Sequence, residues 1–364
     1  MLVVHDWIAA WGGAERCLAE ILQVFPEADL VVGLLGPGMR NFNVVTRRAA
    51  ETWLARIPFA RGHYRWFLPL EGLAFGTLRT TQYDLVVSSS AAFANMVAFT
   101  APALLVSYCY SPPRYLWDLA DVYRAHSSPV QRVTMALGTR PLRALDARAG
   151  ARVDHFMAIS QHVAKRIENA YGKGADVVYP PVSARRVQGR RARRGPFLLS
   201  LGRLVPYKRV DLAARAATLL GLDLVVAGDG PSRRAIERLA GPTVRFLGEV
   251  DEARAAELLS TCAAFVFCGE EDFGIAPLEA NAHGAAVVYY NRGGLTETMV
   301  PGVTGVPFEE PTEEAVAAAI NQCLRTRWSP EDLHANAERF SPARFRGEFL
   351  AIVNRLLAGA ARSP

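Results

Sequence analysis

Short apolar runs alternate with amphipathic stretches along the whole chain. Most of the apolar runs end in glycine, serine or proline, and stretches such as 14–25 and 161–172 then carry apolar residues at helical spacing. This alternation predicts strand–helix–strand units, and therefore parallel sheets with helices on both faces. We expect strands at 2–4, 30–35, 83–87, 103–108 and 153–160, and in the second half at 197–201, 222–230, 244–250, 263–268 and 285–290.

The pattern breaks once, in the middle of the chain. Residues 183–195 are rich in arginine and almost free of apolar residues, and Pro180 and Pro181 stiffen the approach to them. A chain of 364 residues also exceeds what one core usually serves. We predict a first domain at 1–182 and a second at 183–341, both doubly wound and Rossmann-like. The Ser-Pro pair at Ser341 begins a last helix, 342–364, which is expected to pack back on the first domain.

Composition narrows the class of protein. With 51% hydrophobic and 21% charged residues, the chain is expected to fold. It contains no apolar run long enough for a membrane helix and opens without a basic leader, so neither a membrane span nor a signal peptide is expected. The five cysteines are scattered and form no CxxC pair, which favours reduced residues of a cytoplasmic protein and no zinc site.

A net charge of +6, carried mostly by arginine, favours anionic partners. No nucleic-acid-binding motif is visible, so nucleic acid is not expected. In residues 51–79 aromatic residues interleave with arginines, as in segments that contact anionic membranes from the cytoplasmic side. The alternative is that these rings pack into the core. The residues concerned are Trp53, Phe59, Tyr64, Trp66 and Phe67, with Arg56, Arg61 and Arg65.

Two glutamates near the end of the apolar run 263–268 are the first candidates for chemistry. Glu271 lies three residues after the run, as the second of an acidic pair, and Glu279 lies eight residues further on, in a helical pattern. If the helix begins near Ile275, its free N–H groups and positive dipole end suit a diphosphate, while the two carboxylates grip hydroxyl groups on either side. The alternative is a pair of solvated helix-end acids. Phe273 and Gly274 complete this loop, and Gly293 and Gly294 follow the next strand and allow close backbone approach.

Other strand ends of the second half carry polar groups, where an open α/β sheet binds ligands. Arg203 and Lys208 bracket a turn after 197–201 and are suited to neutralise a departing diphosphate. A solvated basic surface is the alternative. Gly202, Asp229, Gly230, Glu249 and Val250 also lie at strand ends of this half and are further candidates for ligand contact.

The first half offers a smaller set. Gly12 and Gly13 form a strand-to-helix turn that admits a ligand to the backbone, or else a simple tight turn. Asp6, Glu15, Tyr110 and Arg114 lie near strand ends and are assigned to the sugar and acceptor side.

The segment from Glu271 to Glu279 resembles the glutamate-x7-glutamate signature of retaining glycosyltransferases of family 4. The resemblance implies the GT-B fold, in which two doubly wound domains face each other across a cleft. It also implies that Glu271 contacts the donor sugar, that Glu279 contacts the ribose, and that Arg203 and Lys208 bind the donor phosphates. The strand ending at Val250 would receive the nucleobase, and the loop of Gly12, Gly13 and Glu15 would lie near the diphosphate and acceptor.

The stretch 109–118 resembles a subgroup of polysaccharide-building enzymes, often mannosyltransferases, that read Cys-His-x-Pro-x-Arg-Tyr-x-Trp-Asp. Tyr110 stands in the histidine position, where the wider family touches the donor sugar. The resemblance therefore implies mannose carried on GDP. A pentose or 6-deoxy sugar is the alternative if Tyr110 fills the space of an exocyclic hydroxyl, and a UDP-sugar is a further one.

These features predict a retaining, metal-independent sugar transferase that needs no cofactor. Its partners are a nucleotide-diphosphate sugar and a glycan or lipid-linked acceptor. The sequence has no Asp-x-Asp pair to hold a cation, so Arg203, Lys208 and helix N-termini must supply the positive charge. A nucleotide-sugar epimerase of the same fold and a catalytically silent scaffold are the competing classes.

Overall fold

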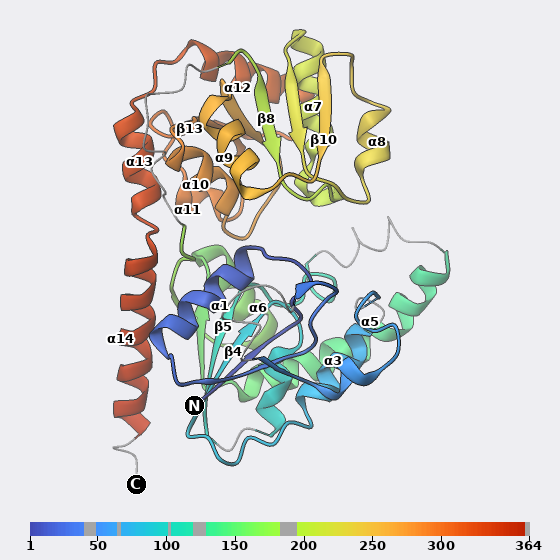
Figure 1. Ribbon diagram of the computed structural model, residues 1–364, viewed down its shortest axis with the longest axis vertical. Coiled ribbons are helices and arrows are strands. Elements are labelled where there is room, and N and C mark those ends of the chain that lie inside the picture. The colour runs from blue at the N-terminus through green and yellow to red at the C-terminus, as the bar shows by residue number, and fades with distance from the viewer. Residues whose placement is uncertain (40–48, 64–66, 101–102, 119–128, 183–194, 361–364) are drawn as a thin grey trace. The chain divides into compact units, whose positions relative to one another are not determined.

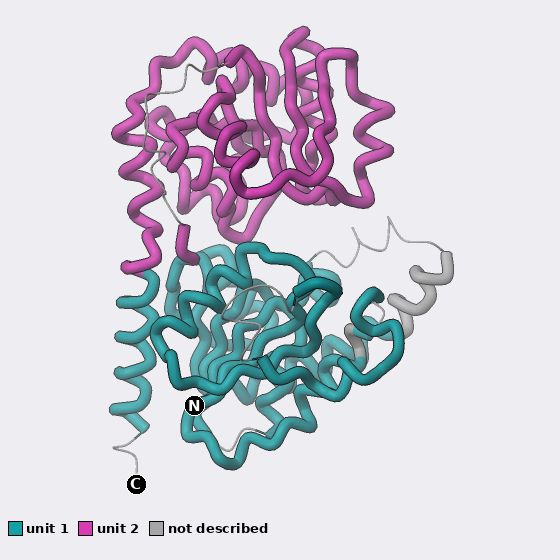
Figure 2. The backbone as a smooth tube through the Cα atoms, viewed as in Figure 1, with its two compact units in different colours: residues 1–179, 345–364 teal, residues 180–344 magenta. Residues whose placement is uncertain are grey.

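The structure is a computed structural model of the 364-residue chain. It describes residues 1–39, 49–63, 67–100, 103–118, 129–182 and 195–360. The contacts divide the chain into two compact units (Figure 2). Unit 1 contains residues 1–179 and 345–364, and unit 2 contains residues 180–344. The expected domain boundaries at 182 and 341 lie close to these limits.

Unit 1 is built on a parallel sheet in the order β3-β2-β1-β4-β5-β6-β7 (Figure 1). Every residue of β1 and β4 is buried, because parallel strands in the middle of a sheet are covered on both faces. The described elements are β1 (Leu2–His5), α1 (Gly13–Val24), β2 (Asp29–Val32), β3 (Ala49–Glu51), η2 (Trp53–Arg56), α3 (Leu68–Phe75), β4 (Leu85–Ser90), η4 (Ala94–Phe99), β5 (Leu104–Cys109), α5 (Pro129–Arg152), β6 (His155–Ala158), α6 (Gln161–Tyr171), β7 (Ala175–Val177) and α14 (Pro342–Ala360).

Unit 2 repeats this plan with a sheet in the order β10-β9-β8-β11-β12-β13. Right-handed crossovers place α7 and α12 together on one face and α9, α10 and α13 on the other (Figure 1). Its elements are β8 (Leu198–Leu201), η5 (Pro206–Lys208), α7 (Val210–Leu220), β9 (Leu224–Ala227), α8 (Arg233–Glu237), β10 (Val244–Gly248), α9 (Glu252–Thr261), β11 (Ala264–Phe267), α10 (Ile275–Ala282), β12 (Val287–Tyr290), α11 (Leu295–Thr298), β13 (Gly305–Phe308), α12 (Glu313–Arg325) and α13 (Pro330–Glu338).

The last helix, α14, packs on unit 1. The fully buried rings of Phe345 and Phe349 lie edge-on to Tyr108, at 5.5 and 5.9 Å between ring centres. Arg346 forms an ion pair with Glu20 on α1. The residues that complete unit 1 therefore come from the far end of the chain.

The sheet of unit 1 ends with β7, just before the two prolines that close the first half of the chain. β7 covers 175–177 and ends before Pro180 and Pro181. Proline has no N–H group to donate to a ladder, so the paired segment stops ahead of the two prolines. The carbonyl of Val178 beyond the strand accepts a hydrogen bond from the Tyr108 hydroxyl instead.

Candidate functional site

The topology of unit 2 marks one place where a ligand site is expected. β8 pairs with β9 on one side and with β11 on the other, so the strand order reverses between β8 and β11. In open parallel sheets, such a reversal opens a crevice outside the carboxyl ends of the two strands. Lys208 follows β8 and Glu271 follows β11. The fold therefore brings these two predicted residues to the same edge.

Lys208 and Glu271 form an ion pair at this edge. Lys208 Nζ lies 3.4 Å from Glu271 Oε1, and each side chain is only 19% exposed. The ammonium group also lies 5.8 Å from the centre of the Phe267 ring, within the range of a cation–π contact. A single carboxylate does not use all three N–H donors of an ammonium group. The ammonium group therefore keeps N–H donors that are suited to an anionic ligand.

Glycines keep the surroundings of Lys208 open. A side chain at Gly269 would collide with the Cα atom of Lys208, and one at Gly228 would collide with the carbonyl oxygen of Gly202. A Cβ atom on Gly202 would lie 3.2 Å from Lys208 Nζ. The predicted glycine at 202 therefore preserves the space beside the ammonium group. Arg203 follows it, with an exposed side chain.

The loop after β11 turns into α10 at the predicted residue. Gly274 is the N-cap, with a left-handed φ of 90°, and α10 begins at Ile275. The start of a helix leaves backbone N–H groups without intrahelical partners and carries the positive end of the dipole. Glu279 lies one turn into the same helix and is half-buried. Phe273 lies in the same loop and also belongs to the predicted site. It is buried and packs edge-on against Phe340.

The glycine pair after β12 clasps this loop. Gly294 N–H donates to the carbonyl of Glu271 at 2.8 Å, and Gly293 has a left-handed φ of 63°. Side chains at these positions would strike the carbonyl oxygens of Glu271 and Asp272. The sequence predicts that Gly293 and Gly294 allow close backbone approach. In the structure, the backbone that approaches them is that of the Glu271 loop itself.

The remaining predicted residues of unit 2 lie at the ends of β9 and β10. Asp229 Oδ1 accepts from Gly230 N–H at 2.6 Å, and Oδ2 pairs with Arg233 at 3.0 Å. These partners, with the N–H contributing most, lower the pKa of Asp229. Glu249 and Val250 follow β10, the edge strand of the sheet. Sequence reasoning missed Arg233, which also pairs with Glu237 and shows no signal beyond the helical i, i+4 spacing.

Unit 1 has its own reversal of strand order, between β1 and β4. Asp6 follows β1, as expected, but its carboxylate is buried and already occupied. It accepts backbone N–H groups of the segment that leads into η4, among them Ala92 at 2.9 Å, Phe93 at 3.0 Å and Ala94 at 2.8 Å. Burial nevertheless raises the pKa of Asp6 to about 6. This carboxylate therefore organises the backbone of unit 1, and its assignment to the sugar and acceptor side stays a prediction.

The predicted glycine loop of unit 1 leads into α1. Gly12 is the N-cap residue, and its N–H donates to Glu15 Oε2 at 2.9 Å, so the first turn is closed by a capping interaction. Burial raises the pKa of Glu15 to about 7, and the nearby charge of Asp6 adds to this. Gly12 and Gly13 are half-buried. The loop and its acid thus form one local unit at the helix N-terminus.

Tyr110 is buried, and its hydroxyl has partners within unit 1. It lies 2.8 Å from Ser89 Oγ and donates to the carbonyl of Ala14 at 2.8 Å. Arg114, four residues later, is half-buried. The end of its loop is fixed by an ion pair between Asp118 and Arg166 at 2.5 Å. The expected contact of Tyr110 with a sugar stays a prediction, and it competes with these two internal bonds.

The same loop is anchored by a buried acid that sequence reasoning did not single out. Asp146 Oδ2 accepts from Trp117 Nε1 at 2.8 Å and from the Tyr171 hydroxyl at 3.0 Å. Burial raises the pKa of Asp146 to about 7. A lone acid in the arginine-rich helix α5 gave no reason to expect this role.

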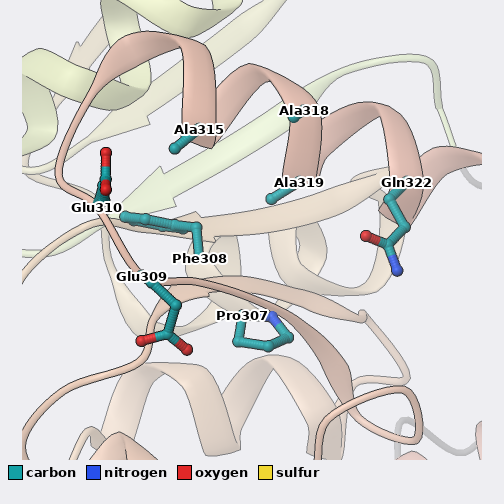
Figure 3. Close-up of a pocket in the computed structure, with 8 residues that line it drawn as sticks. All are labelled: Pro307, Phe308, Glu309, Glu310, Ala315, Ala318, Ala319 and Gln322. Carbon is teal, nitrogen blue, oxygen red and sulfur yellow. The ribbon is translucent and has the colours of Figure 1, made fainter.

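A hollow of about 390 Å³ lies beside β13 and α12, at the edge of the unit 2 sheet (Figure 3). Its floor is apolar, with Phe308 and Ala319, and Glu309 and Glu310 are its charged residues. None of its described lining residues is basic. Because a diphosphate requires positive charge, this hollow does not suit the donor.

The aromatic and basic segment 51–79 is described in part. Phe59 is 82% exposed and Trp53 is 38% exposed, so these rings do not pack into the core. Arg61 forms a two-pronged ion pair with Glu51 at 2.6 and 2.8 Å. Tyr64, Arg65 and Trp66 lie outside the described residues.

Two features are absent from the described part of the chain. No helix there is both long enough and apolar enough to cross a membrane. No three His, Cys, Asp or Glu side chains in the described ranges gather into a group that could hold a metal ion. Metal independence stays a prediction.

The family model for glycosyl transferases group 1 matches residues 183–340. A GDP-mannose-dependent alpha-(1-6)-phosphatidylinositol monomannoside mannosyltransferase of Mycobacterium tuberculosis is 28% identical over 240 residues, which are 57% of this chain and 62% of the relative. A D-inositol 3-phosphate glycosyltransferase of Geodermatophilus obscurus is 30% identical over 266 residues, 62% of this chain and 58% of the relative. The chain thus spans less than two thirds of the length of these relatives.

Among solved structures, HepE of Anabaena in complex with UDP-glucose matches with a TM-score of 0.74 and 19% identity, covering 97% of this chain and 99% of that one. Sucrose-phosphate synthase from Thermosynechococcus elongatus matches with a TM-score of 0.71 and 17% identity, covering 99% and 100%. At this identity the likeness establishes the fold, which is the α/β GT-B fold, as predicted.

Proposed function

We propose that this protein transfers a sugar from a nucleotide-diphosphate sugar to a glycan or lipid-linked acceptor, with retention of configuration. The observation that carries the proposal is the Lys208–Glu271 pair at the reversal of strand order in unit 2. As the donor bond breaks, negative charge develops on the leaving diphosphate. A preorganised ammonium group beside it lowers the energy of that state. The exposed guanidinium of Arg203 and the N-terminus of α10 add positive charge at the same edge.

Glu271 and Glu279 have separate roles in this proposal. Glu271, at the end of β11, receives hydroxyl groups of the sugar, and Glu279, in α10, receives those of the ribose. Carboxylates accept hydrogen bonds from hydroxyl groups on either side of a diphosphate without needing a metal ion. No cofactor or cation enters the mechanism.

GDP-mannose is the proposed donor. The Mycobacterium tuberculosis relative is named for it, and the loop 109–118 resembles those of mannosyltransferases. A UDP-sugar is the second candidate, because the HepE structure contains UDP-glucose. A pentose or 6-deoxy sugar is the third and rests on Tyr110. Peripheral contact with the inner face of an anionic membrane, through exposed Trp53, Arg56 and Phe59, would bring the enzyme to a lipid-linked acceptor.

Release of nucleoside diphosphate tests the transferase. We expect GDP-mannose or a UDP-sugar to yield free nucleoside diphosphate when a bacterial lipid extract or a panel of short glycans is added, and little without an acceptor. An epimerase would convert the donor sugar with no acceptor present. A scaffold would produce neither change, and either of these results would contradict the proposal.

A further inference from the structure

A chain of three buried side chains links β1, β4 and β5 to the N-terminus of α1. His5 Nδ1 lies 2.9 Å from Ser89 Oγ, Ser89 Oγ lies 2.8 Å from the Tyr110 hydroxyl, and that hydroxyl lies 2.8 Å from the carbonyl oxygen of Ala14. His5 and Ser89 are at most 2% exposed, and Tyr110 is 9% exposed. Ala14 is the second residue of α1.

Hydrogen counting fixes the direction of every bond in this chain. A carbonyl oxygen only accepts, so the Tyr110 hydroxyl donates its single hydrogen to Ala14. Ser89 must then donate to Tyr110, and His5 Nδ1–H must donate to Ser89. Burial lowers the pKa of His5 to about 4, so the ring is neutral and its hydrogen lies on Nδ1. Neither hydroxyl keeps a hydrogen to give to a sugar.

The ring of Tyr110 is held as firmly as its hydroxyl. It packs edge-on against Tyr108 at 5.3 Å and against His5 at 6.4 Å between ring centres. An edge-on arrangement fixes the plane of a ring. The hydroxyl therefore reaches Ala14 from a rigid base on the sheet.

We infer that Tyr110 is a positioning residue, which fixes the N-terminus of α1 through the Ala14 carbonyl and does not select the donor sugar. The inference rests on the proposed function, in which the Gly12–Gly13 loop at this N-terminus meets the donor diphosphate. Gly12 itself is tied to Glu15 in the same first turn. The hydrogen bond from Tyr110 ties Ala14 to the sheet, so the first turn of α1 is fixed. A turn held only by its own cap would fray.

The test compares two buried tyrosines by hydrogen–deuterium exchange of the whole protein. Tyr110→Phe keeps the ring and removes the tether, so the amides of residues 16–18 should exchange about five to thirty times faster, as the loss of one buried hydrogen bond predicts. Tyr171→Phe is the matched control, because it removes a buried hydroxyl that donates to Asp146 at 3.0 Å. It should leave α1 unchanged. Unchanged exchange in α1 of Tyr110→Phe would overturn the inference.

Two further readouts separate positioning from selection and from simple loss of folding. With GDP-mannose and UDP-glucose as probes, Tyr110→Phe should raise the donor KM severalfold without changing which donor is preferred. A reversed preference would make Tyr110 the selector. If wild-type protein uses neither probe, the proposed function is in doubt, while the exchange measurement still decides the tether. If Tyr110→Phe does not fold, Tyr110→His replaces it, because it also lacks the phenolic hydroxyl that donates to Ala14. Faster exchange confined to α1 then supports the tether, and uniformly faster exchange overturns it.

Discussion

At the scale of single residues, the proposed function gives Lys208 the largest role. Replacing Lys208 by Ala should lower kcat by about two orders of magnitude, which is the effect of losing one preorganised donor to a developing charge. The midpoint of thermal unfolding should also fall, because the carboxylate of Glu271, only 19% exposed, loses its partner, so the rate is to be measured well below that midpoint. Acceptor-dependent nucleoside diphosphate release measures the rate.

The chain offers a matched control for this substitution. Lys165 is an exposed lysine on α6, and Lys165→Ala should leave the rate unchanged. A loss of less than threefold in Lys208→Ala would mean that Lys208 is an ordinary solvated surface lysine.

Full activity in EDTA is also expected. Inactivation by EDTA that magnesium reverses would transfer the role of the lysine to a cation.

The same scale shows what a sequence reveals about a site. Lys208, Glu271 and the helix start at Ile275 were predictable, because strand ends, glycines and spacing are local signals. The roles of Asp6 and Tyr110 were not. The partners of Asp6 lie more than 80 residues away, and His5 and Ser89 are separated by 84 positions. Spacing along a chain does not say which buried hydroxyl or N–H group a folded carboxylate will meet.

At the scale of elements, the start of α7 stores backbone strain. Arg209 is its N-cap and has a left-handed φ of 49°, and its side chain reaches Asp211 at 3.2 Å. A residue with a Cβ atom is disfavoured in this conformation by about 1 to 2 kcal/mol, and glycine is not. We therefore expect Arg209→Gly to be more stable than Arg209→Ala by about 1 kcal/mol, measured by urea unfolding.

This pair of variants is its own control. Both lose the contact with Asp211, so their difference isolates the backbone conformation. If Arg209→Ala equals or exceeds Arg209→Gly in its free energy of unfolding, the left-handed conformation costs nothing here. Arg209 lies directly after Lys208. The activity of Arg209→Gly should therefore also show whether the position of Lys208 depends on this turn.

Element boundaries follow the same division between local and distant causes. Most of the strand–helix alternation was predictable, although the edge strands β3 and β13 were not among the expected strands, and the Ser-Pro helix start at Ser341 was placed correctly at α14. β2, expected to reach Leu35, ends at Val32. Gly33 N–H there turns to the carbonyls of His5 and Asp6, a tertiary contact that apolar character alone does not reveal.

At the scale of the whole molecule, exposed aromatic and basic side chains of unit 1 predict binding to anionic membranes. Phe59 and Arg56 are exposed in unit 1, so the double variant Phe59→Ala with Arg56→Ala should bind phosphatidylglycerol vesicles at least tenfold more weakly. Each basic residue contributes about 1 kcal/mol near an anionic surface, and an inserted ring adds to this. Vesicle sedimentation measures the bound fraction. Arg245→Ala, an exposed arginine of unit 2, is the control for net charge. Equal binding of all three proteins would argue against membrane contact through this segment.

The path of the chain also sets the order in which its parts can be completed during synthesis. Unit 2 is one continuous segment, whereas unit 1 needs Phe345 and Phe349 from α14 to cover Tyr108 and Phe25. A ribosome delivers those two rings only after all of unit 2 has been made. Until then, apolar surface on unit 1 stays open to water and to other nascent chains. The half that is synthesised first is therefore the half that is finished last, and it is the one that would require a chaperone in the interval.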